Sequence, residues 1–256
     1  MERVELITWT LLTASLVSIP LAFVLSSSLP VVFLIVSVSW LLSPMFFTED
    51  RALFNLCLAH SLFFLILYVR VLVSSAAEPV DQDHLFTYHL EQGVALLVLL
   101  VLARRFFSFP ALRLTRDGLV RALLIGLAVG LPYGVLDQAS GEGLIEMPSM
   151  GFVNTFIWIA TLAVFVGLLE ELLFRGILYG AARGLVGSRM ASLYQAVLFS
   201  AVHYPNPLSA LAAALLFSVV MVYILERTGN LFAPAAAHAA NNTVWMMLGR
   251  FAPITF

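Results

Sequence analysis

The chain has 256 residues, of which 61% are hydrophobic and 11% are charged, and all 13 of its basic residues are arginines. Soluble domains have about 25% charged residues, so this composition excludes an ordinary cytosolic or secreted enzyme. The mean hydropathy of +1.00 instead predicts a polytopic membrane protein. The formal net charge of −2 says nothing about partners.

Apolar segments follow one another along almost the whole chain. A helix that spans a membrane needs about 20 mostly apolar residues, and the runs are continuous and of about that length. Residues 26–30, which contain three serines and a proline, are all that separates the first two segments. We therefore predict an all-α, polytopic transmembrane helical bundle of eight to nine spans. The segments are 5–26, 29–47, 52–74, 86–103, 119–136, 152–184, 190–204, 208–226 and 231–250.

The charges between the segments predict an orientation. The connection 104–121 carries five arginines and one acid, which is typical of a cytoplasmic loop. The loops on either side of it contain acids and no arginine, so we expect both outside. With nine spans, the N-terminus lies in the cytoplasm and the C-terminus outside. The acids of the two external loops are Glu78, Asp81 and Asp83, and Asp137, Glu142 and Glu146.

Small residues recur with a spacing of four in two segments. Residues four apart share one face of a helix, where glycine lets two backbones approach closely. We therefore expect both sets to be packing faces. The two sets are Gly126, Gly130 and Gly134, and Gly176, Gly180 and Gly184. The single cysteine, Cys57, cannot form an internal disulfide or a cysteine-based zinc site, and we expect a small buried side chain there.

Polar and ionisable groups inside the segments are concentrated in the last hundred residues. Such groups are costly in lipid and mark functional sites by default. Glu171 and Arg175 lie four apart with the acid first, which favours an ion pair on one helix face. Glu170 points about 100° away from Glu171. We therefore expect it to be left unpaired by Arg175 and free to face a cavity.

Two later segments carry histidines. His238 and Asn242 lie four apart and share a face, while Phe199 lies one turn before His203 and can wall that histidine. At a rise of about 1.5 Å per residue, Glu170, His203 and His238 reach similar depths inside the membrane. We therefore predict that they meet in one site, an intramembrane active-site cavity of the helical bundle.

These groups together predict water attack on an amide. A buried glutamate is a good general base near neutral pH, and Glu170 could deprotonate a water held by His203. His238 and Asn242 could donate hydrogen bonds to the oxyanion of a tetrahedral intermediate. No serine or cysteine is obviously paired with the histidines for covalent catalysis.

The pattern E-E-x-x-x-R, then F-x-x-x-H, then H-x-x-x-N on successive membrane helices resembles the CPBP family. These are the type II CAAX-prenyl-protease-like, Rce1-related intramembrane proteases, also called Abi proteins. The resemblance covers about residues 150–250. It divides the chain into a catalytic transmembrane core at 119–256 and a region at 1–118, with N-terminal helices and the basic loop, that carries no recognised motif.

The resemblance implies an intramembrane glutamic-type endopeptidase that needs no cofactor. Its expected partners are the lipid bilayer and a membrane-embedded or membrane-anchored protein or peptide substrate, with no nucleic acid. The absence of lysine would suit a GC-rich genome and hints at a bacterial cytoplasmic membrane. The implied roles are Glu170 as the water-activating acid, His203 as its assistant, His238 and Asn242 as the oxyanion-stabilising pair, and Glu171, Arg175 and Phe199 as supporting residues.

Two alternatives stay open. His203, His238 and Glu170 would match a zinc set of two histidines and a glutamate, which would make the protein an intramembrane metalloprotease. The chain could also be a non-catalytic membrane scaffold that retains the motifs. Outside the motifs, we expect Trp158 and Trp245 to face lipid or pack. His60, Arg70 and Glu91 could pair with one another, line a cavity or lie near an interface.

Overall fold

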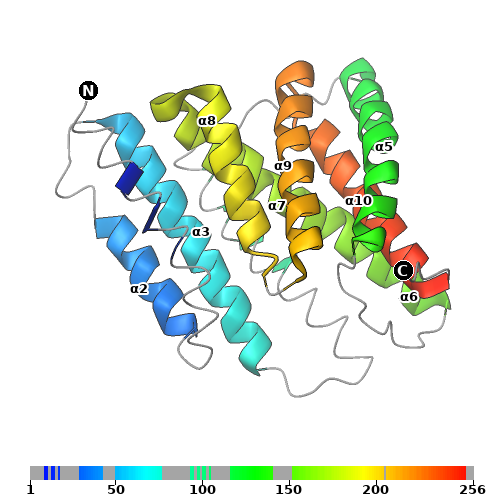
Figure 1. The fold of residues 1–256 in the computed structure, drawn as a ribbon, viewed down its shortest axis with the longest axis horizontal. Coiled ribbons are helices and arrows are strands. Elements are labelled where there is room, and N and C mark those ends of the chain that lie inside the picture. Colours follow the sequence, from blue (N-terminus) through cyan, green and yellow to red (C-terminus); the bar gives the residue numbers. More distant parts are fainter. Residues whose placement is uncertain are drawn as a thin grey trace.

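All regular structure that we describe is helical, as the sequence predicts (Figure 1). The computed structural model describes residues 9–10, 13–14, 17, 29–42, 50–76, 93–94, 97–98, 100–101, 104, 116–140, 152–204 and 206–251. The elements are α2 (Leu29–Leu42), α3 (Arg51–Ala76), α5 (Arg116–Ala139), α6 (Phe152–Ala160), η3 (Thr161–Val166), α7 (Gly167–Glu171), η4 (Leu172–Leu178), α8 (Tyr179–Ala201), α9 (Leu208–Thr228) and α10 (Phe232–Phe251).

Three helices in the described ranges are long and apolar enough to cross a membrane. They comprise Arg51–Val69, Gly118–Ala139 and Leu208–Thr228. These helices support an integral membrane protein, but they do not confirm a count of eight or nine spans. Most of the predicted segments 5–26 and 86–103 lies outside the described residues.

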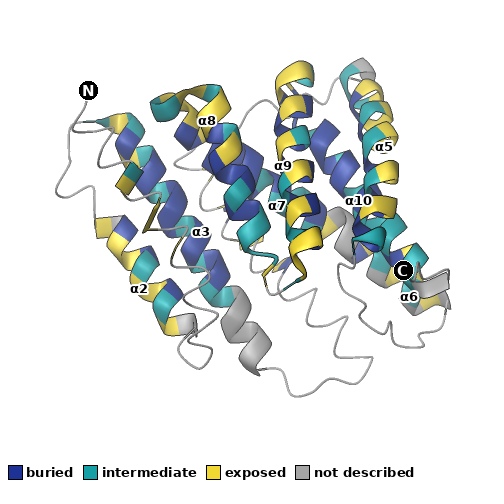
Figure 2. Cartoon of the chain, viewed as in Figure 1, coloured by how far each residue is buried: buried dark blue, intermediate teal, exposed yellow. Residues whose placement is uncertain are grey.

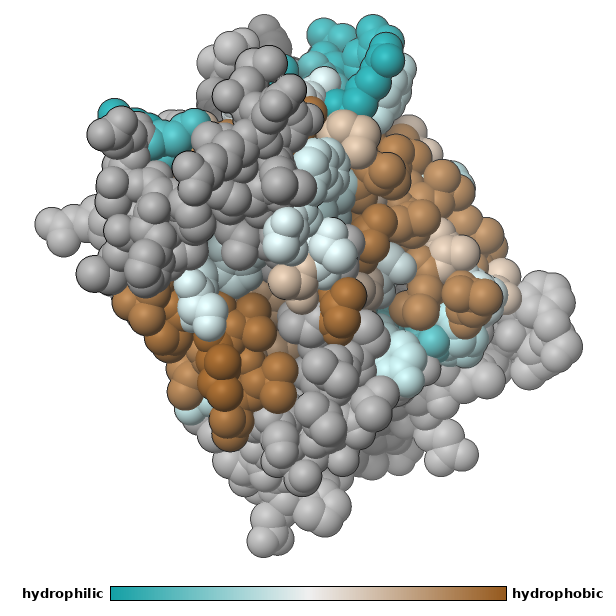
Figure 3. Space-filling view, turned by 60° about the vertical axis from the view of Figure 1, so that its left-hand side comes forward, coloured by the Kyte–Doolittle hydropathy of each residue, from teal (hydrophilic) through white to brown (hydrophobic). Residues whose placement is uncertain are grey.

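The outer surface of the bundle is rich in apolar side chains, as a lipid-facing surface requires. Large hydrophobic residues are exposed along α2 and α5, for example Ile35 and Leu124, which are 59% and 63% exposed. Figure 3 shows broad hydrophobic areas on one face of the molecule, and Figure 2 shows buried residues where the helices face one another. Exposed apolar patches of this extent are typical of membrane or protein contact.

Residues 152–201 form a succession of helical segments with two π-helices and one break in the helical backbone. The segments η3 and η4 are π-helices, and they flank the short helix α7. Gly187 then interrupts the helical backbone within α8, at φ 74° and ψ 167°. Glycine adopts a positive φ without the steric cost that a side chain brings. The interruption falls inside the connection predicted between the segments 152–184 and 190–204.

Helices α2 and α3 pack side by side at one end of the bundle, and α3 in turn packs against α8 (Figure 1). His60 lies in this contact. Its Nδ1 is 2.8 Å from the Leu56 carbonyl oxygen, its Nε2 contacts the Tyr194 hydroxyl, and its ring stacks on Trp40. His60 therefore has a packing role here. Cys57 is fully buried, as expected, whereas the Arg70 side chain and Glu91 lie outside the described residues.

Helices α5 and α10 pack closely at the other end of the bundle, and glycine makes this possible. A Cβ added at Gly130 would lie 2.1 Å from the Ala237 carbonyl oxygen. One added at Gly126 or Gly134 would lie 2.5 Å from the nearest side-chain atom of α10. The first predicted packing face is therefore confirmed. The second is wrong at Gly180, where a Cβ would meet no described atom within 4 Å.

This contrast predicts unequal effects of the same substitution. Gly130→Ala should lower the free energy of unfolding by about 1–3 kcal/mol, the usual cost of overpacking, because the added methyl group meets rigid backbone. Gly180→Ala should be neutral or slightly stabilising, because alanine favours a helix more than glycine does. Unfolding of the purified proteins in mixed micelles by a denaturing detergent measures both. Equal midpoints for the two variants would contradict the close packing of α5 on α10.

Candidate active site

Helix α7 brings two adjacent glutamates to the centre of the bundle. Gly167 begins this helix and lies against α10, where an added Cβ would be 3.3 Å from the Ala239 backbone nitrogen and 3.5 Å from His238 Cγ. The absence of a side chain lets α7 pass close to α10. Glu171, four residues later, reaches His238 with its Oε1 2.8 Å from the histidine Nδ1.

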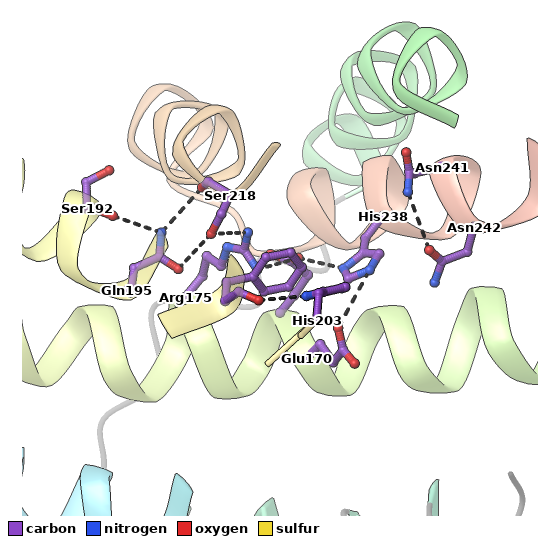
Figure 4. Close-up of polar contacts among 11 residues, drawn as sticks. Glu170, Arg175, Ser192, Gln195, His203, Ser218, His238, Asn241 and Asn242 are labelled. Atoms are coloured by element: carbon purple, nitrogen blue, oxygen red, sulfur yellow. Dashed lines mark hydrogen bonds and ion pairs between the residues drawn. The ribbon is translucent and has the colours of Figure 1, made fainter. Parts of the chain in front are cut away.

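Glu171 also forms the predicted ion pair. Arg175 Nη1 donates to Glu171 Oε1 at 2.9 Å, and both side chains are 0% exposed. Behind this pair, Arg175 Nη2 donates to Ser218 Oγ at 2.9 Å, and Ser218 Oγ donates to Gln195 Oε1 at 3.1 Å (Figure 4). A buried pair needs such additional hydrogen bonds to offset the cost of desolvation. The polar chain from α8 through α9 therefore fixes the carboxylate that holds His238.

His238 lies between the two glutamates. Its Nδ1 donates to Glu171 Oε1, and its Nε2 is 3.8 Å from Glu170 Oε2 on the opposite side of the ring (Figure 4). Phe199 and Phe217 pack against the imidazole with centroid distances of 5.9 and 5.3 Å. These contacts fix the plane of the ring. Nε2 is consequently the nitrogen of His238 that can serve a reacting group.

His203 lies in the turn after α8, just beyond the helical segment. Its Nδ1 is 2.7 Å from the Phe199 carbonyl oxygen, and its ring centroid is 4.8 Å from that of Phe199. A carbonyl only accepts hydrogen bonds, so Nδ1 carries the proton and Nε2 of the neutral ring is an acceptor. Phe199 walls the histidine, as its position one turn earlier predicts. Its ring also lies 4.6 Å from the Arg175 guanidinium carbon.

A cavity of about 200 Å³ unites the predicted residues. Glu170, His203, His238, Asn242 and Phe199 all line it. Glu171 and Arg175 lie behind this wall. Glu171 contacts His238, and Arg175 contacts Glu171. The structure therefore brings together the side chains that the sequence predicts to meet. Five of the predicted residues face the cavity, whereas Glu171 and Arg175 do not.

Three cavity residues lie where the sequence did not lead us to expect them. Asp137, predicted in an external loop, is inside α5, is 5% exposed and lines the cavity. Asn241 lines it too and donates from Nδ2 to Asp137 Oδ2 at 2.6 Å. Trp245 also lines it, rather than only facing lipid or packing. The Trp158 side chain lies outside the described residues.

The placement of Asp137 has a simple explanation. It follows directly on the predicted segment 119–136, whose uninterrupted apolar run ends at Leu136. Helix α5 continues to Ala139 because Asp137 is paired with α10 instead of water. A polar residue one position past an apolar run can still lie in the helix, and the adjacent pair Asn241-Asn242 on α10 was the available signal for a partner.

The side chains also bear on metal binding. Among the described residues, no three His, Cys, Asp or Glu side chains are grouped so that they could hold a metal ion. His238 Nδ1 is engaged by Glu171, so Nε2, which is 3.8 Å from Glu170 Oε2, is the ring nitrogen left for a ligand. Glu170, His203 and His238, the residues of the zinc alternative, therefore do not form such a group in this arrangement.

Comparison with known protein families supports the resemblance. Residues 152–244 match the model of a family described as type II CAAX prenyl endopeptidase Rce1-like. This range contains every residue of the three motifs and ends before Trp245. The same comparisons found no similar curated protein and no similar solved structure. The second half of the chain therefore carries an Rce1-like domain, which is consistent with the CPBP family of CAAX-type proteases.

Proposed function

We propose that this protein is an intramembrane endopeptidase that cleaves a peptide bond of a membrane-embedded or membrane-anchored substrate by direct attack of water. The observation that carries the proposal is the joint lining of one cavity by Glu170, His203, His238 and Asn242. The Rce1-like match implies a protease, and the apolar helices of the fold support an activity at the membrane.

Water activation falls to Glu170 and His203. The Glu170 carboxylate and the His203 Nε2 are both hydrogen-bond acceptors, so one water can donate to each and turn its lone pair toward a substrate carbonyl carbon. As the C–O bond forms, Glu170 takes a proton from the water. It then gives that proton to the leaving amine nitrogen when the C–N bond breaks, which restores the carboxylate.

Oxyanion stabilisation falls to His238 and Asn242. Because His238 already donates from Nδ1 to Glu171, it needs a second proton on Nε2 to donate to the oxyanion. The Asn242 amide supplies the second donor from one turn further along α10. Donors held in place before the reaction stabilise charge in the transition state without reorganisation.

Comparative mass spectrometry of membrane peptides tests this proposal. Cells that carry the wild-type protein are compared with cells that carry Glu170→Gln, which keeps the shape of the side chain and removes the base. We expect at least one peptide that is processed only by the wild type. Glu226→Gln is the matched control, because Glu226 lies at the end of α9 and contacts Tyr179 and Arg183 rather than the cavity.

Three outcomes of this comparison have defined meanings. Processing by the wild type and by the Glu226→Gln protein, but not by the Glu170→Gln protein, supports the proposed function and identifies a substrate. Processing that persists in the Glu170→Gln protein contradicts the assigned role of Glu170. If no peptide is processed in any of the three cultures, although folded protein is present in each, the result would favour the non-catalytic scaffold.

A further inference from the structure

The pair formed by Asp137 and Asn241 has no part in the chemistry described above, although both residues line the cavity. Each residue is 5% exposed, and Asp137 comes from α5, outside the region that matches the Rce1-like family. A carboxylate inside an apolar bundle is costly and is retained where it has a function. Its direct contact is with the residue that precedes Asn242.

The hydrogen bonds of this pair fix the orientation of two amides in series. A carboxylate oxygen that carries no proton only accepts hydrogen bonds, and Asp137 Oδ2 accepts from the amino end of the Asn241 side chain at 2.6 Å. The same Asn241 Nδ2 carries a second hydrogen and donates it to Asn242 Oδ1 at 3.5 Å. Asp137 thereby determines which end of Asn241 faces Asn242.

The consequence for Asn242 follows directly. With its oxygen turned toward Asn241, the amide nitrogen of Asn242 lies at the opposite side of the group, as Figure 4 shows. That nitrogen is the donor an oxyanion needs, whereas a flipped amide would present an oxygen and repel it. We propose that Asp137 and Asn241 are positioning residues that hold the Asn242 amide with its donor toward the reacting carbonyl, an inference that rests on the proposed function.

Asp137 and Asn241 each keep one oxygen without a hydrogen-bond partner in the described part of the chain, which agrees with a positioning role rather than a stabilising one. Asp137 Oδ1 and Asn241 Oδ1 are buried and have no hydrogen-bond partner among the described residues. Buried polar atoms in proteins are nearly always paired, and replacing both side chains by apolar ones would remove both unpaired oxygens. A pair that keeps two unpaired oxygens contributes less to stability than a satisfied one. Its orienting effect on Asn242 gives it a separate reason to be retained.

The test combines steady-state kinetics with a double-mutant cycle. The proteins are the wild type, Asp137→Ala, Asn242→Ala, the double variant and Asp137→Asn, and the probe is the peptide substrate found by the comparison of cells. Asp137→Ala should lower kcat about tenfold with little change in KM. Asp137→Asn should lower it by no more than about threefold, because its side-chain oxygen still accepts from Asn241. In the Asn242→Ala background, Asp137→Ala should cause no further loss of kcat.

Two kinetic results would overturn the proposal. One is an unchanged kcat in Asp137→Ala, and the other is an equal fold-loss from Asp137→Ala with and without Asn242, which would mean that Asp137 acts by another route. Ser200→Ala is the matched control. Its hydroxyl donates to the Leu211 carbonyl between α8 and α9 at 2.7 Å, and the residue does not line the cavity. It should leave kcat unchanged.

Unfolding of the same proteins keeps this test separate from that of the proposed function. If the wild type cleaves no peptide, the proposed function fails. The hydrogen bonds from Asp137 through Asn241 to Asn242, which we call the relay, still predict that the unfolding midpoints of the variants are coupled. The midpoint shift of the double variant should then be smaller than the sum of the two single shifts. Ser200→Ala combined with Asn242→Ala should give the full sum. Additive shifts for Asp137→Ala and Asn242→Ala would overturn the relay whatever the kinetics show.

Discussion

A protein that carries Glu170→Gln is expected to cleave its substrate on the order of 10³-fold more slowly than the wild type, with its fold intact. General acid–base groups contribute about 10²- to 10⁴-fold to rate, and the glutamine amide cannot take the proton from water. The fold should tolerate the change, because Glu170 is not part of the buried ion pair of Glu171 and Arg175 and its side chain faces the cavity. Steady-state kinetics on the purified proteins measures the effect.

Two controls test whether the loss of cleavage is specific to Glu170 and independent of metal. Glu226→Gln makes the same chemical change outside the cavity and should retain the wild-type kcat. Cleavage by the wild type should also be unchanged after treatment with a metal chelator, since the proposed mechanism uses only side chains and water. Stoichiometric zinc in the purified protein, together with loss of cleavage on chelation, would instead assign Glu170, His203 and His238 to a metal site.

Arg175→Met should be the most destabilising single change, lowering the free energy of unfolding by about 3–5 kcal/mol. Removing one partner of a buried ion pair leaves the other charge uncompensated, which has a cost of that size. Glu171, at 0% exposure, would lose its charged partner, and the Ser218 hydroxyl would lose a donor. Arg183→Met is the matched control. Arg183 is 59% exposed and 3.9 Å from Glu226, so its loss should change stability by less than about 1 kcal/mol.

The double variant Glu171→Met with Arg175→Met separates stability from function. Replacing both members of a buried pair by apolar residues is often neutral or stabilising, so the double variant should unfold near the wild-type midpoint. It should nevertheless remain inactive, because His238 Nδ1 has lost its acceptor and the ring is no longer fixed. A double variant that is both stable and fully active would show that Glu171 does not hold His238 for catalysis.

Local spacing explains why much of the site could be predicted from the sequence. Residues four apart on a helix lie on one face whatever the rest of the fold does. This spacing predicted the Glu171–Arg175 pair, and it predicted that His238 and Asn242 lie on the same side of their helix. The meeting of Glu170, His203 and His238 followed from equal depths along successive helices. These predictions needed only the rise and turn of an α-helix.

The features that were missed depend on contacts between helices. Hydropathy ended the predicted segment before Asp137, because nothing local indicates that Asn241 will pair with a carboxylate 104 residues earlier. The π-helices η3 and η4 on either side of α7 were not predicted either. Such segments are frequent at functional sites, but they arise from packing rather than from a sequence period. Gly180 followed the same spacing as Gly130, yet no described neighbour approaches it.

The close packing of α5 on α10 also sets the order in which the site can form during synthesis. A ribosome makes Gly130 and Asp137 about a hundred residues before it makes their partners on α10. Until α10 emerges and inserts, the glycine face of α5 and its carboxylate have no described surface to cover them. The cavity is thus completed only once α10 has been made, and a nascent protein halted before α10 contains neither His238 nor an assembled site.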